Sequence, residues 1–205
     1  MPWQPALPPT DKESFARWVY DQFLSLAKWL TGTVYYSNIS LPSSAINLRG
    51  AAADPTRSTT TGLLEFSGTA DNVIAGAVQF PNGWSPKHAT IRPHIHIRFP
   101  TSAAANTRWK FEYDFGNDVI DFANAYGTYT TLGTITVANP QNVNSAAHAD
   151  FGSIDMSGAS DEPVLVYRIS RLANSDAADT DTNYCVLLDV DIHFYRNALG
   201  LERKY

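Results

Sequence analysis

The sequence predicts an all-β protein, an antiparallel jelly-roll-like β-sandwich with one amphipathic helix and a proline-rich arm before it. From residue 59 onward, apolar residues recur at every second position in about eight short stretches, as expected for half-buried strands. Gly, Pro, Asn and Ser separate these stretches, and no helical pattern lies between them. Because strands without helical crossovers pair as hairpins, the architecture expected is an antiparallel sandwich.

The first part of the chain, residues 1–32, is expected to be an extended arm followed by an anchoring helix. Four prolines within the first nine residues exclude a helix or a paired strand there. Thr10 and Glu13 then form a capping-box pattern, and Gly32 is a typical stop after the apolar periodicity. The apolar stripe packs either on the β domain or on copies of itself. The residues expected to form this anchor or oligomer interface are Trp3, Leu7, Phe15, Trp18, Val19, Phe23, Leu26 and Trp29.

The remainder divides into a connector, residues 33–58, with little periodicity, and a β-sandwich domain, residues 59–205. Within the domain the loop 174–182 is expected to be exposed, because it is rich in Asp, Ala and Thr. The expected strands cover residues 63–66, 73–80, 89–99, 108–115, 128–137, 149–154, 164–172 and 184–195.

Two histidines lie two positions apart in an apolar run, IRPHIHIRFP, residues 91–100. Alternate residues of a strand share a face, so His94 and His96 point the same way, opposite Ile95, Ile97 and Phe99. The last expected strand alternates in the same manner. There the even-numbered residues from Tyr184 to Phe194 are expected to form the apolar side, and His193 lies on the polar side. The strand 108–115 also has one apolar and one charged face.

If these three strands are neighbours in one sheet, their polar faces combine, and three interpretations remain open. The favoured one is a solvated outer face or subunit contact made of charged cross-strand pairs. A second is a metal site of His94, His96 and His193, joined by Asp191 or Glu112. In a third, one histidine from each chain of a trimer meets on the symmetry axis and holds a shared ion or water. Apart from such a metal, no cofactor is expected.

Composition and motifs exclude several classes of protein. The net charge of −5 and the absence of a Lys/Arg run argue against nucleic-acid binding. No apolar run approaches the length of a membrane span, and no secretory signal pattern begins the sequence. The single cysteine, Cys185, excludes an intrachain disulfide and is interpreted as an inert core residue. The sequence shows no nucleophile elbow, P-loop or zincin motif and does not match the cupin spacing, so an enzyme is not expected.

The stretch 91–100, the following NTRWKFEY of residues 106–113 and the late DIHFY of residues 191–195 resemble virion structural proteins of tailed bacteriophages. The resemblance covers roughly residues 60–197, and no catalytic residues are carried over from it. It implies a β-sandwich appendage or cement-like component in a symmetric oligomer, located in the virion after assembly in the host cytoplasm.

The function expected is therefore that of a non-enzymatic structural component of a phage particle. A homo-trimer is expected, with the N-terminal arm and helix contacting sister chains or other virion proteins. Two alternatives remain. One is a glycan-binding or receptor-binding head, with Trp84 as the aromatic platform for a sugar on the host surface. The other is a metal-dependent jelly-roll enzyme that uses His94, His96 and His193.

Overall fold

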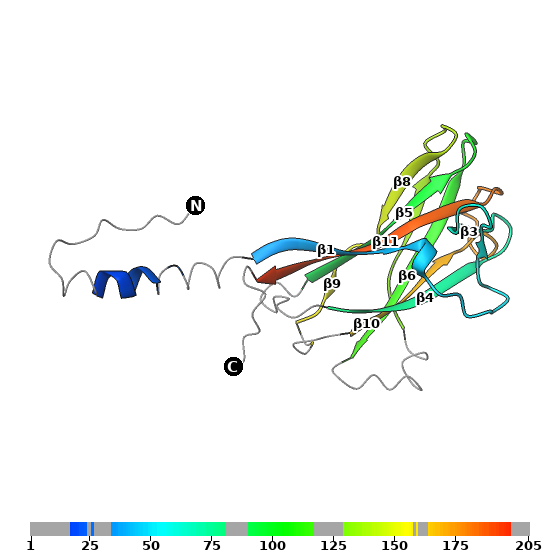
Figure 1. Ribbon diagram of the computed structural model, residues 1–205. Coiled ribbons are helices and arrows are strands. Elements are labelled where there is room, and N and C mark those ends of the chain that lie inside the picture. Colours follow the sequence, from blue (N-terminus) through cyan, green and yellow to red (C-terminus); the bar gives the residue numbers. More distant parts are fainter. Residues whose placement is uncertain are drawn as a thin grey trace.

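The computed structural model describes residues 17–23, 26, 34–80, 90–116, 129–157, 159 and 164–197. Two antiparallel sheets pack face to face, which confirms the predicted jelly-roll-like β-sandwich (Figure 1). The larger sheet contains β1 (Val34–Pro42), β2 (Thr56–Arg57), β3 (Leu64–Phe66), β5 (Thr90–Phe99), β8 (Ser145–Asp150), β9 (Ile154–Asp155) and β11 (Cys185–Asn197). The smaller sheet contains β4 (Asn72–Gln79), β10 (Val164–Arg171), β6 (Asn106–Gly116) and β7 (Thr130–Ala138), in that spatial order.

Two long strands, β5 and β11, form the centre of the larger sheet. They pair with each other, and the outer edge of each is shared by two shorter partners. On β11 the partners are β3 and then β1, whereas on β5 they are β9 and then β8. Other strands therefore flank the central pair along both of its edges. The residues on the outward face of β5 and β11 lie in the middle of a broad surface.

The core lies between the sheets and is built by alternation. On β5 the residues Ile91, Pro93, Ile95, Ile97 and Phe99 are buried, whereas the residues that alternate with them are only half-buried or exposed. Strands of the smaller sheet contribute large side chains from the opposite side, including Trp109 of β6. This alternation matches the pattern from which the strands were predicted.

A buried charge network closes one end of the core. Arg171 of β10 is fully buried and donates two hydrogen bonds of 3.0 Å to the carboxylate of Asp179. Its guanidinium also donates to the carbonyl oxygens of Phe66, Asn183 and Asp181. Burial alone lowers the pKa of Arg171, but the hydrogen bonds and charge of Asp179 outweigh it and hold that pKa above its ordinary value. The loop 174–182, expected to be exposed, thus sends the acidic side chains of Asp179 and Asp181 into the interior.

The stretch 33–58, predicted to be a connector, includes two strands of the larger sheet. β1 pairs with β11 along its whole length, from Val34 opposite Asn197 to Pro42 opposite Asp189, and a short 3-10 turn, Ser43–Ala45, follows it. Ile39 and Leu41 of β1 pack against the core, but the next inward position is taken by Ser37. Because this serine interrupts the apolar alternation, β1 is hard to recognise from the sequence. β2 has two residues and offers no periodicity.

The expected strand 149–154 is divided into β8 and β9. Gly152 lies between them with a φ of +99°, a backbone conformation that favours glycine. The turn lets both short strands pair with β5, β8 through residues 145–150 and β9 through Ile154 and Asp155.

The phase predicted for the first part of β11 is wrong because of a bulge. Its pairing with β5 shifts between Leu187 and Asp189, so Leu188 is an extra residue on that strand. Before the bulge, Cys185 and Leu187 belong to the core; after it, Val190, Ile192 and Phe194 do. Tyr184, Val186 and Leu188 were expected on the apolar side with them, but none of the three is part of the core cluster.

The described part of the N-terminal helix covers residues 17–23, and residue 26 is again helical. Figure 1 shows this segment outside both sheets. Of the anchor residues predicted from the sequence, Trp18, Val19 and Leu26 are half-buried and Phe23 is 71% exposed. Trp3, Leu7, Phe15 and Trp29 lie outside the described residues.

Candidate functional site

The outward face of β5 and β11 carries imidazoles opposite carboxylates. His94 lies directly across from Asp191, and His96 lies across from Asp189. Because directly opposite residues of an antiparallel pair point to the same side, all four side chains share the outer surface of the sheet. Two residues further along, on the same face, His193 lies across from Arg92.

On the other side of β5, the strand β8 extends these rows. His148 lies across from His96, and Asp150 lies across from His94. Asp150 accepts a 2.9 Å hydrogen bond from Arg92, so an ion pair crosses the sheet beside the imidazoles. The face therefore presents four of the five histidines of the chain together with both signs of charge.

These side chains surround a hollow of about 290 Å³ on the outer face of the larger sheet. The residues that line it are Arg92, His94, His96, His148, Asp150 and His193. The lining consists of charged and imidazole side chains alone, so the hollow suits a polar or ionic ligand better than an apolar one.

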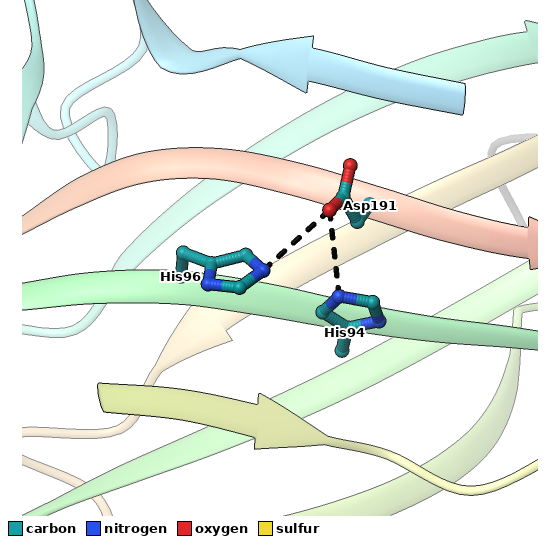
Figure 2. A group of neighbouring side chains, drawn as sticks. All are labelled: His94, His96 and Asp191. Carbon is teal, nitrogen blue, oxygen red and sulfur yellow. Dashed lines mark ion pairs between the residues drawn. The ribbon is translucent and has the colours of Figure 1, made fainter. Parts of the chain in front are cut away.

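The innermost group consists of His94, His96 and Asp191 (Figure 2). Nε2 of each histidine lies 3.5 Å from the same oxygen, Oδ2 of Asp191. His94 and Asp191 are the least exposed, each with a side chain 12% exposed, whereas His96 is 38% exposed. One carboxylate oxygen is thus the meeting point of two imidazoles that come from a neighbouring strand.

The rings contact one another, and this constrains their orientation and protonation. The His94 ring lies edge-on to His193, with centroids 4.3 Å apart, and to His96, with centroids 5.0 Å apart. Burial lowers the pKa of His94, and the neighbouring His193 lowers it further, although Asp191 opposes both. Burial also raises the pKa of Asp189. The neutral form of His94 is therefore favoured, which is the form that binds metals and accepts hydrogen bonds.

The structure places His94, His96 and His193 next to one another, as their faces suggested. The residue whose side chain lies close to both His94 and His96 is Asp191 rather than His193. Asp191 was predicted as an additional ligand of the metal site. The prediction of Glu112 as an additional metal ligand is wrong. This residue lies on β6, in the smaller sheet, where it forms ion pairs with Lys110 and Arg168. The premise that three strands, among them 108–115, share one sheet fails for that strand.

Three residues that line the hollow, Arg92, His148 and Asp150, were not predicted as site residues from the sequence. His148 and Asp150 form a His-x-Asp pattern on β8, and this alternation was the available signal. It was weak because β8, SAAHAD, has alanines where larger apolar residues mark the other strands. Arg92 was read only as part of the strand. Trp84, the predicted sugar platform, lies outside the described residues.

No protein-family model matches the chain, and no curated protein matches it. Among solved structures, a family 35 carbohydrate binding module from an environmental isolate is similar, with a TM-score of 0.43 and 11% identity over 78% of this chain and 96% of that one. The C-terminal CBM6 of LamC from Zobellia galactanivorans has a TM-score of 0.39 and 11% identity, covering 76% of this chain and 98% of that one. The CBM22-2 xylan-binding domain of Paenibacillus barcinonensis Xyn10C has a TM-score of 0.39 and 14% identity, with the same coverage.

These similarities are too low to transfer a ligand, so the function is argued from the residues themselves. Within the described parts of the chain, no helix has the length and apolar character that crossing a bilayer requires.

Proposed function

We propose that this chain is a non-enzymatic structural component of a tailed-bacteriophage particle. In this proposal the β-sandwich is the outward head, and the N-terminal segment attaches it to sister chains in a homo-trimer and to the particle. The resemblance of residues 91–100 and 106–113 to virion proteins supports the assignment, and those stretches form β5 and most of β6, one central strand in each sheet.

The observation that carries the proposal is the contrast between a closed head and two exposed aromatic side chains on the described part of the N-terminal helix. The buried apolar residues of the sandwich come from both sheets and pack on one another. In the helical segment, by contrast, Tyr20 is 64% exposed and Phe23 is 71% exposed. Large apolar side chains exposed near one another on a helix mark a surface that another molecule covers. A closed β-sandwich with an exposed apolar surface on its N-terminal helix is the arrangement expected of a head domain with an anchoring segment.

The test uses the full chain with Tyr20→Ser and Phe23→Ser together. We expect native mass spectrometry to find trimers of the wild type and a shift toward monomers in the double variant. The matched control is Val143→Ser, because Val143 is 63% exposed but belongs to the sandwich, and its substitution should leave the trimer intact. A wild-type monomer, or a trimer unchanged by the double substitution, would contradict the anchoring role.

The location in a particle needs its own measurement. Particles released from cultures that encode the chain should contain it after purification on a density gradient, as detected by mass spectrometry of the particle band. Its absence from every particle fraction, together with abundant free protein, would refute the assignment.

A second candidate function, recognition of a host glycan by the same head, is favoured by the polar hollow on the larger sheet. The Arg92–Asp150 pair and the surrounding imidazoles present donors and acceptors side by side, which the hydroxyl groups of a sugar require. A glycan array probed with the wild type and with Arg92→Ala tests it. Binding that is lost in the variant supports the candidate, and an array without wild-type signal ends it. Trp84→Ala tests in the same assay whether that tryptophan is the platform.

A further inference from the structure

We infer that His94, His96 and Asp191 form a binding site for one divalent transition-metal ion, with Zn²⁺ as the reference ion. The site would join the two central strands of the larger sheet, β5 through both histidines and β11 through the aspartate. It stands on the geometry of these three residues and does not depend on the chain being a particle component.

The first argument is the set of donor atoms. His94 and His96 are alternate residues of one strand, so their imidazoles project from the same face. Asp191 is directly opposite His94 on the paired strand. Two imidazole nitrogens and one carboxylate oxygen are a common ligand set for Zn²⁺, Co²⁺, Ni²⁺ and Fe²⁺. These ligand atoms lie within 4.8 Å of one another, so one ion can contact all three.

The second argument is distance. Both Nε2 atoms are 3.5 Å from Oδ2 of Asp191, longer than the roughly 2.7–3.2 Å of an N–H···O hydrogen bond. Two ligand atoms bound about 2.0–2.1 Å from one zinc ion at a tetrahedral angle are about 3.4 Å apart. Both N···O spacings therefore match those between ligands of one tetrahedral ion. Figure 2 shows both imidazole nitrogens directed at the same carboxylate oxygen.

The third argument is the polar group that the protein leaves unsatisfied. Oδ1 of Asp191 is buried and has no hydrogen-bond partner among the described residues. A buried carboxylate with an unmatched oxygen is costly, and an ion bound through Oδ2 would offset part of that cost by balancing the charge of the carboxylate. His94 and His96 line the open hollow as well, so water or a ligand group has access to the remaining coordination positions.

The experiment is isothermal titration of ZnSO₄ into the full-length protein after chelator treatment and dialysis. We expect one ion per chain. Each of His96→Gln and Asp191→Asn should weaken binding by at least about 10–100-fold, since even loss of a residue that only orients a ligand has an effect of that size. The matched control is His148→Gln, which removes an imidazole of the same hollow outside the three ligands and should retain binding.

A second readout guards against a folding defect in the variants. Titration with Co²⁺ should give visible absorption bands of a tetrahedral or five-coordinate ion in the wild type and in His148→Gln, and these bands should be lost in Asp191→Asn. Circular dichroism of each variant verifies that the sheet is intact. Three results would each overturn the inference: no wild-type binding, equal binding by His96→Gln and Asp191→Asn, or one ion per three chains, which would indicate an ion shared on a symmetry axis.

Discussion

The buried pair of Arg171 and Asp179 offers the sharpest test of what stabilises this sandwich. The side chains are 0% and 1% exposed, and two 3.0 Å hydrogen bonds join them. Substitution of Arg171 by Met keeps most of the side-chain volume but leaves the Asp179 carboxylate buried. Its remaining hydrogen bond among the described residues is then the 2.9 Å bond from the backbone N–H of Arg108.

The expected loss follows from this uncompensated charge. Removal of one partner of a buried ion pair costs about 3–5 kcal/mol, and domains of this kind are stable by about 5–15 kcal/mol. Arg171→Met should therefore remove about a fifth or more of the free energy of unfolding, measured by urea denaturation with tryptophan fluorescence. The carbonyl oxygens of Phe66, Asp181 and Asn183 lose their donor in the same step and add to the cost.

The matched control is a pair of similar length at the surface. Arg92 and Asp150 are joined at 2.9 Å, but their side chains are 53% and 43% exposed, so Asp150→Asn should cost less than about 1 kcal/mol. A double variant, Arg171→Met with Asp179→Leu, should be more stable than Arg171→Met alone because it removes the orphaned charge. An Arg171→Met variant no less stable than Asp150→Asn, or a double variant with strictly additive losses, would refute this reasoning.

Three further predictions concern single residues. Burial raises the pKa of Cys185 to about 12, so its thiol should be inert to a disulfide reagent at pH 8 and react fully only in denaturant. Gly68→Ala should lower the free energy of unfolding by about 1–3 kcal/mol, because an added Cβ would overlap the backbone of Thr182. Burial raises the pKa of Asp71, but hydrogen bonds from Ser175 and Asn174 outweigh it and keep that pKa below its ordinary 3.8. Asp71 thus adds stability above pH 3.8 that is lost as acid protonates it, and acid titrations of Asp71→Asn should lack this component.

Much of the fold was predictable because the strands that face the core on one side alternate cleanly. Burial along β5 alternates as its sequence does, with Ile91, Pro93, Ile95, Ile97 and Phe99 at the inward steps. β1 was missed because its short inward side includes Ser37 beside Ile39 and Leu41. Such a strand is recognised by its nine paired residues on β11, a long-range property that local periodicity does not contain.

The site was predictable only in part, for the same physical reason. Period two places His94 and His96 on one face whatever their partners are. Which strands flank the two histidines depends on the order of strands in the sheet. Polarity does not reveal that order, because the outward face of β6 is as polar as that of β8. Glu112 was therefore grouped with the histidines although its strand lies in the other sheet, and His148 was left out although it lies across from His96.

The bulge in β11 is what brings acids and imidazoles together. Leu187 faces the core opposite Ile97, and an uninterrupted ladder from that point would place Asp189 opposite Ile95 with its carboxylate in the core. The extra residue at Leu188 shifts the strand by one step. Asp189 then meets His96 on the outer face, and the same step sets Asp191 across from His94. One inserted residue thus keeps two carboxylates out of the core and builds the acid–histidine rows from which the metal site is inferred.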